Sequence, residues 1–385
     1  MFEGLVFGWR SALLAACVLQ LLAVAAAMQR TLMNRKANRT LAMLLVVLAG
    51  VLAPWLIGFA GFYDRWRWLT FAPLACPPAI GPLLWFYIHA LVRGRWPPWA
   101  GLHLAPPAAY LLFMTGSFLL PMSLKEPWAD LTLDPMDRIV WLGSAAGLAV
   151  YAVKGLRLLR RYRALLSAHR SDDHRYAALW LSRALGATLA LLLVWTIYAL
   201  WNAVSPLGYF TLMGLHLAIA MFSLYLAVEG WRHAALPFPN MDALTPEPLP
   251  EPLPQHSGRD WRDQGARWAD TIRKEGWAAM PDVSLATLAR RLGTNMSHLS
   301  RALNAGLGVG FSGFINGLRC EAVAAAIDRG ATGDLLDLAL EAGFSSKASF
   351  NRAFQAAYGM TPSAYRRAAQ GKASQITNIG PDTRN

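Results

Sequence analysis

The sequence predicts an all-α protein, in which a seven-span transmembrane helical domain is followed by a soluble domain with two helix-turn-helix units in tandem. Long uncharged stretches fill the first 235 residues, and charged residues become dense only after a Pro-rich segment. A short Ala-x3-Gly pattern then occurs twice, 50 residues apart, in a region with helical periodicity and no alternating strand pattern. Together these features favour membrane helices first and a small helical domain second.

Composition separates the two parts. The chain has 385 residues, of which 55% are hydrophobic and only 15% are charged, whereas soluble domains carry about 25% charged residues. Residues 1–235 contain 20 Lys/Arg and 9 Asp/Glu, and residues 259–373 contain 15 and 10 in half the length. A disordered or collagen-like chain is therefore excluded. The three cysteines, at positions 17, 76 and 320, are too scattered for a disulfide framework and offer no CxxC spacing.

The gaps between charges set the number of spans. A helix needs about 20 apolar residues to cross a bilayer. The 45 uncharged residues between Arg183 and Glu229 would form a helix of about 68 Å, so the chain must turn back, and residues 202–206 are the best place. A further span is expected from Arg138 to about Leu159. The remaining uncharged runs have 19, 24, 25 and 29 residues, and the total is seven spans.

Basic residues predict the orientation of these spans. They cluster in the loops after the first, third and fifth spans, which places those loops in the cytoplasm. The N-terminus then lies outside, the C-terminal domain lies in the cytoplasm, and residues 121–137 form a short outer loop of a multi-pass membrane protein. A cleaved signal peptide at residues 1–28 is disfavoured, because the basic cluster follows the apolar run instead of preceding it.

A few polar side chains lie within or near the spans, namely His89, Lys154, Asn202 and His216. An ionisable residue in a membrane is a functional candidate. The simpler interpretation is that Lys154 extends to the cytoplasmic interface and that the histidines bond neighbouring helices. These residues form no metal-ligand cluster and no nucleophile–base pair, so we expect no enzyme, no cofactor and no metal.

The segment 236–258 is rich in proline, acidic, and unable to form a core. We expect it to be an extended spacer of about 70 Å between the membrane domain (residues 1–235) and the soluble domain (residues 259–373). Residues 374–385 are expected to be a disordered tail.

The repeated pattern places Ala289 before Gly293 and Ala339 before Gly343. In a helix-turn-helix unit, a small residue in the first helix lets the second helix pack close, and a turn glycine permits the sharp reversal. The pattern therefore predicts two such units. A continuous helix at about residues 311–329 would hold them at a fixed separation.

The second helix of each unit supplies the candidate site. It covers about residues 296–304 in the first unit, with Thr294 or Asn295 as its N-cap, and about residues 346–358 in the second. Arg suits guanine, Asn suits adenine, and Ser and Lys suit phosphates, so outward residues of these types favour double-stranded DNA as a ligand. An ordinary helical bundle with solvated bases is the alternative. The outward residues are Ser297, Ser300, Arg301 and Asn304 in the first unit and Lys347, Asn351 and Arg352 in the second, with Ser346 or Ser349 near the phosphates.

Residues 339–354, ALEAGFSSKASFNRAF, with YGMTPSAYR at 358–366, closely resemble the C-terminal signature of AraC/XylS-type transcription regulators, and FINGLR at 314–319 is similar to that family's segment between its two units. The resemblance covers about residues 265–370. It implies sequence-specific promoter binding by two recognition helices, carried here by Ser297, Ser300 and Arg301 and by Lys347, Asn351 and Arg352. The sequence AGLGVG at 305–310 departs from the family by replacing its usual basic stretch.

The resulting hypothesis is a membrane-tethered one-component transcription regulator. Its expected partners are promoter DNA, the lipid bilayer, a second copy of the chain paired through the membrane part, and a small-molecule or membrane signal. One alternative is a membrane enzyme or transporter with a fused DNA-binding regulatory domain, for which His89, His103 and His216 are the only hint. Another is a membrane half that serves only as an anchor.

Overall fold

The computed structural model describes residue 5 and residues 7–170, 176–205, 212–244, 261–280 and 283–377. Within these ranges every regular element is a helix, and extended pairing is confined to an isolated bridge between Arg170 and Ser284. The predicted all-α class is therefore confirmed. The chain divides into two compact units, Met1–Arg161 with Ala178–Asn240 and Tyr162–Ala177 with Met241–Asn385, and each is described by itself.

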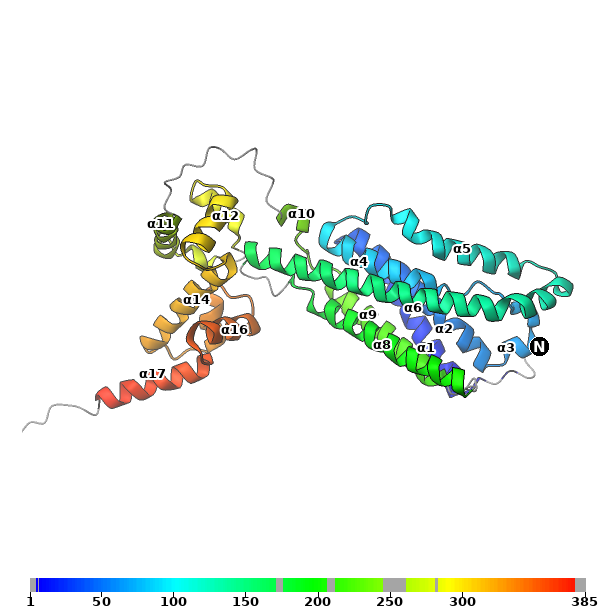
Figure 1. The fold of residues 1–385 in the computed structure, drawn as a ribbon. Helices are drawn as coiled ribbons and strands as arrows, with labels where there is room; N and C mark the ends of the chain where they lie inside the picture. Colours follow the sequence, from blue (N-terminus) through cyan, green and yellow to red (C-terminus); the bar gives the residue numbers. More distant parts are fainter. Residues whose placement is uncertain are drawn as a thin grey trace, which may run out of the picture. The chain divides into compact units, whose positions relative to one another are not determined.

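Long helices make up the first unit, and short turns of helix connect two of them (Figure 1). The connecting elements are α3 (Phe62–Arg65), η1 (Arg67–Leu69) and η2 (Pro77–Ala79). The long helices are α1 (Trp9–Gln29), α2 (Arg35–Phe59), α4 (Ile80–Arg93), α5 (Ala100–Phe118), α6 (Met122–His169), α8 (Leu179–Val204) and α9 (Met213–His233).

Five of the described helices, namely α1, α2, α6, α8 and α9, are long and apolar enough to cross a membrane. The predicted count of seven spans is not confirmed. Helix α4 has only 14 residues, and α5 carries Pro106 and Pro107 within its 19 residues.

Close packing and one buried amide join the helices of the first unit. A Cβ added at Gly230 of α9 would overlap the end of the Leu41 side chain on α2, so the two helices pack closely at this glycine. The buried Asn38 side chain donates to Thr31 Oγ1 at 2.8 Å and to the carbonyl of Ala234 at 3.0 Å. This amide ties the turn between α1 and α2 to the end of α9 and satisfies the Ala234 carbonyl.

The expected outer loop at residues 121–137 is wrong, because this segment is the beginning of α6. Its carboxylates, such as Glu126 and Asp130, are exposed on the helix surface and do not mark a loop. The buried Lys125 donates to the carbonyls of Trp68 and Phe118. Pro127 and Pro135 lie inside α6, although a proline within a helix removes one backbone hydrogen bond. The helix also continues past the expected end at Leu159, as far as His169.

The described helices of the second unit are short, apart from its central helix. They are α10 (Met241–Leu244), α11 (Trp261–Lys274), η4 (Trp277–Ala279), α12 (Leu285–Arg291), α13 (Met296–Arg301), the π-helical turn η5 (Ala302–Gly306), α14 (Phe311–Asp328), α15 (Leu335–Glu341), α16 (Lys347–Tyr358) and α17 (Pro362–Thr377). Most of the expected spacer, at residues 245–258, and the end of the expected tail, at residues 378–385, lie outside the described residues.

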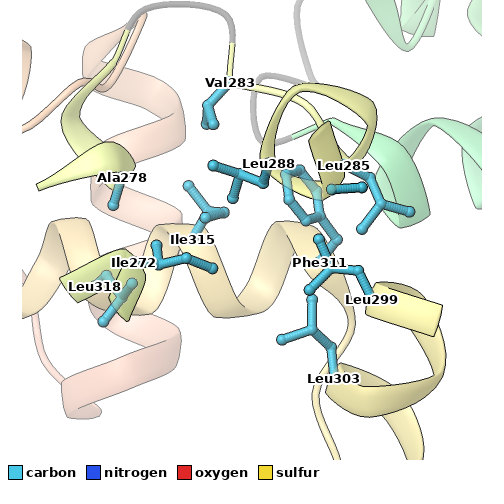
Figure 2. Packing of buried hydrophobic residues seen from close by; sticks show 11 residues of the cluster. Ile272, Ala278, Val283, Leu285, Leu288, Leu299, Leu303, Phe311, Ile315 and Leu318 are labelled. Carbon is cyan, nitrogen blue, oxygen red and sulfur yellow. The ribbon is translucent and has the colours of Figure 1, made fainter. Parts of the chain in front are cut away.

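Helix α14 contributes to two hydrophobic cores. Its first half supplies Phe311 and Ile315 to a core with Leu288, Leu299 and Leu303, whose side chains converge in Figure 2. Its second half supplies residues to another core, which also contains side chains of α15 and α16. The buried members of that second core are Cys320, Val323, Ala324, Ile327, Ala339, Ala342, Phe344, Phe350 and Phe354. One helix therefore forms a wall of both helix-turn-helix units.

Candidate DNA-binding site

The first helix-turn-helix unit consists of α12, a tight turn and α13. Ser284 caps α12, because its Oγ accepts a hydrogen bond from the Thr287 N–H at 3.2 Å. Gly293 in the turn has φ +66°, a left-handed conformation that glycine adopts without steric cost. Asn295 is the N-cap of α13, since its Oδ1 accepts from the His298 N–H at 2.8 Å. Of the two expected caps, Asn295 therefore fills the role.

The second unit, α15 with its turn and α16, is built in the same way. Asp334 caps α15 by accepting from the Leu336 N–H at 3.0 Å. Gly343 in the turn has φ +97°. Ser346 caps α16, because its Oγ accepts from the Ser349 N–H at 3.2 Å.

The two turns share one hydrogen-bond pattern. The Thr294 N–H donates to the carbonyl of Ala289, and the Phe344 N–H donates to the carbonyl of Ala339, both at 2.9 Å. Both alanines are almost fully buried, at 2% and 0% exposure. The 50-residue repeat in the sequence is thus a repeat of turn geometry, in which a small residue and a turn glycine let the second helix approach the first.

Helix α13 is shorter than expected, because the α-helical turns end at Arg301 and a π-helical turn follows at Ala302–Gly306. The cause is close contact with α11. A Cβ added at Gly306 would overlap the carbonyl of Trp261, and one added at Gly265 would lie 2.7 Å from the carbonyl O of Ala302. The first part of the Gly-rich stretch at 305–310 therefore has a packing role.

The candidate residues of α13 and of the following turn η5 are partly engaged within the protein. Arg301 is exposed, and its guanidinium lies 5.5 Å from the ring centroid of Trp261. Asn304 is also exposed, and its Nδ2 donates to the carbonyl of Ser300 at 2.9 Å. Ser297 and Ser300 are half-buried. The contacts of Ser300, Arg301 and Asn304 hold these three side chains in defined positions.

The candidate residues of α16 form a more open surface. Lys347, Asn351 and Arg352 are all exposed. Arg352 lies on the face opposite the buried phenylalanines of α16, Asn351 lies beside that buried stripe, and Lys347 is the first residue of the helix. Ser346 and Ser349 are half-buried and bonded to each other, with Ser349 Oγ donating to the carbonyl of Ser346 at 2.8 Å. The hydroxyl of Ser346 serves as a helix cap, which is a structural role.

A buried arginine connects the two helix-turn-helix units. Arg319 of α14 is 2% exposed. Its Nε donates to the carbonyl of Ala278 at 2.8 Å, and its Nη2 donates to that of Met280 at 3.3 Å. The guanidinium also lies 5.7 Å from the ring centroid of Phe344, in the turn of the second unit. Arg319 thus fixes η4, α14 and the second turn together.

Sequence reasoning did not identify the roles of Trp261 and Arg319. Trp261 begins α11 and contacts both Arg301 and His298, the latter with ring centroids 5.7 Å apart. The spacing of α11 residues shows an amphipathic helix but does not say where its first turn docks. Among the described residues, no group of three or more His, Cys, Asp or Glu could hold a metal ion.

Comparison with known proteins supports this geometry. A family model described as "Helix-turn-helix domain" matches residues 288–368. A Staphylococcus aureus protein named "Uncharacterized HTH-type transcriptional regulator" is 43% identical over 86 residues, and proteins of strains MSSA476 and N315 match equally well. The alignment covers 22% of this chain and only 11% of each relative. No solved structure matches the chain. The chain carries an AraC-type helix-turn-helix domain at residues 288–368.

Proposed function

We propose that this protein is a membrane-tethered transcription regulator, which binds promoter DNA by placing α13 and α16 in successive major grooves. The observation that carries the proposal is the pair of turns with matching hydrogen bonds, each followed by helical turns that carry an exposed Arg and an exposed Asn side chain. Recognition helices of one rigid body reach successive grooves when they lie about 34 Å apart along the DNA.

Helix α16 makes the main base contacts in this proposal. Arg352 is suited to the paired acceptors of guanine, Asn351 to adenine, and Lys347 to a backbone phosphate. Their side chains extend from a helix that is anchored by the buried Phe350 and Phe354. A rigid platform of this kind lets a small number of contacts discriminate between sequences.

Helix α13 has a different role in DNA binding from that of α16. Arg301 lies over the Trp261 ring, and Asn304 is bonded to Ser300, so their use for DNA requires these contacts to be kept or replaced. We propose that α13 positions the protein through Arg301 and its cap region, and that α16 supplies most of the sequence discrimination.

The membrane part tethers and regulates the domain. Five helices have the length and apolarity for membrane spans, and the basic loops favour a cytoplasmic C-terminal domain in a bacterial inner membrane. A signal that prefers one arrangement of these helices over another would change the placement or pairing of the DNA-binding units, including pairing of two copies of the chain.

DNA binding by α16 can be tested with Arg352→Ala in the full chain, held in detergent and bound to an operator found by genome-wide mapping of bound DNA. The change should weaken binding by about 1–3 kcal/mol, roughly 5- to 150-fold. Arg329→Ala is the matched control, because Arg329 is exposed but follows the end of α14. Equal losses in the two variants at fixed salt would mean that only net charge matters, and base readout by Arg352 would be excluded.

The orientation can be tested by labelling in cells. Cys17, Cys76 and Cys320 are buried, so the wild-type chain should give a low background with a membrane-impermeant maleimide. Gln255→Cys adds one thiol in the expected spacer. It should react only after the inner membrane is opened, and reaction in intact spheroplasts would place the spacer outside and reject the tethered regulator.

A further inference from the structure

The compact unit formed by Met1–Arg161 and Ala178–Asn240 contains a cavity of about 600 Å³ between α5 and α6. This cavity also reaches η2 and the beginning of α4. Figure 1 shows α5 and α6 running alongside each other in this unit. The cavity lining extends along α6 from Met136 to Tyr151, which is about 23 Å of helix. The space is therefore long and narrow, and most of its lining is apolar.

Glycines of α6 keep this space open. Gly143 and Gly147, one turn apart, both line the cavity, and a Cβ added at either would meet no atom within 4 Å. The opposite wall is loosely held, because Pro107 and Ser117 are the buried residues of the 19 in α5. Pro106 and Pro107 also lack the N–H that a regular helix would use for its own backbone. A slender apolar molecule can therefore enter beside α5 without displacing a packed core.

Polar groups gather at one end of the cavity. The His103 Nδ1 and the Tyr151 hydroxyl lie 2.8 Å apart and both residues line the space. One turn further along α6, the Lys154 ammonium lies 5.5 Å from the Tyr151 ring centroid and 5.1 Å from that of Trp85. Across the described residues, no ion pair joins a carboxylate to Lys154. Lys154 is exposed and does not line the cavity, but it lies beside the end where the Tyr151 hydroxyl and the His103 imidazole bond each other. An anion at this end would accept hydrogen bonds from the ammonium and from a neighbouring ring N–H or hydroxyl.

We propose that this cavity binds a single-chain amphiphile with a carboxylate headgroup, such as a long-chain fatty acid. The chain lies along Gly143 and Gly147, and the carboxylate is bound by Lys154, Tyr151 and His103. In the proposed membrane orientation, this end of α6 leads toward the basic residues Arg157 and Arg160, at the depth where an amphiphile in the inner leaflet holds its headgroup.

The proposal uses the membrane orientation of the proposed function but not its DNA binding. Occupancy presses on α5 and α6, and α6 continues as one helix to His169. The amphiphile would therefore be the signal that the membrane part detects. Direct binding measurements separate this inference from the regulatory one, because they do not require any operator.

The test uses the full chain in phosphatidylcholine nanodiscs and a photoreactive analogue of palmitate, with labelling measured under competition by unlabelled lipids. Gly147→Leu should abolish saturable labelling by filling the cavity. Gly186→Leu on α8 is the matched control, because it is also an open glycine of an apolar helix but does not line the cavity. Equal labelling of wild type and Gly147→Leu would overturn the site.

Headgroup recognition is tested with Lys154→Gln. Palmitate should compete at least roughly tenfold better than methyl palmitate for the wild-type chain, as a charge-assisted contact implies, and this preference should vanish in the variant. Equal competition by the two lipids would overturn the assignment of a carboxylate. Competition by phosphatidylglycerol in the nanodisc at the strength of palmitate would make an ordinary bilayer lipid the occupant and would also overturn it.

Discussion

The two turn glycines predict a measurable difference between otherwise identical substitutions. Alanine at Gly293 or Gly343 places a side chain at positive φ, +66° and +97° respectively. The left-handed region costs an L-residue about 1–2 kcal/mol. This cost applies to both variants, and at Gly293 it is the main one, since an added Cβ would meet nothing within 4 Å.

At Gly343 a second cost is added. The new Cβ would lie 2.7 Å from the carbonyl O of Ala279 and 2.9 Å from its C and Cα. These are backbone atoms of η4, which Arg319 also anchors, so no side-chain rotation can relieve the overlap. Overpacking of this kind costs about 1–3 kcal/mol. Gly343→Ala should therefore destabilise the domain by about 2–5 kcal/mol, against about 1–2 kcal/mol for Gly293→Ala.

Pulse proteolysis of the full chain in detergent across a urea series, detected with a tag at the C-terminus, measures this difference as a shift in the urea midpoint of cleavage. The wild-type chain is the reference. Equal shifts for the two variants would refute the steric role of Ala279, and a larger shift for Gly293→Ala would refute the assignment of its open surroundings.

Three further predictions use the same assay. Arg319→Met should destabilise the domain by about 1–3 kcal/mol, because two buried carbonyl groups lose their donor, and no change in midpoint would contradict this role. Asn295→Ala and Ser346→Ala should each cost about 1 kcal/mol by removing a helix cap, and unchanged midpoints would show that the caps are replaced. Burial raises the pKa of Cys320 from 9.0 to about 12. Above about pH 9 the unfolded thiol loses its proton and the folded one keeps it, so stability should fall between about pH 9 and pH 12; a Cys320→Ala variant with an equal fall would exclude this thiol as a cause.

Much of the tandem helix-turn-helix domain was predictable from local sequence. A small residue four positions before a glycine determines each turn, and helical periodicity separates the buried Phe350 and Phe354 from the exposed Arg352, which lies on the opposite side of α16. These features depend on neighbours within a few residues. The docking of Trp261 against Arg301 and of Arg319 against η4 was not predictable, because each pairs side chains or carbonyls about 40 residues apart.

The predictions that the structure does not bear out rest on local sequence features alone. Charges and prolines at residues 121–137 suggested a loop, but a helix can expose such charges on one side, and α6 runs through the segment. The end of α13 at Arg301 depends on the backbone of α11, which meets Gly306 directly. The count of seven spans rested on uncharged length alone, which says nothing of where α4 begins.

The position of α14 between two hydrophobic cores has a consequence for how the domain unfolds. Neither turn-bearing half can lose its central helix without opening the interior of the other, so the two halves should melt together as a single cooperative transition. Damage to the hydrophobic core of one half then also disorders the other half. Substitution of exposed side chains can therefore change base preference, but few substitutions of the buried residues of α14 are tolerated, because together they supply both cores.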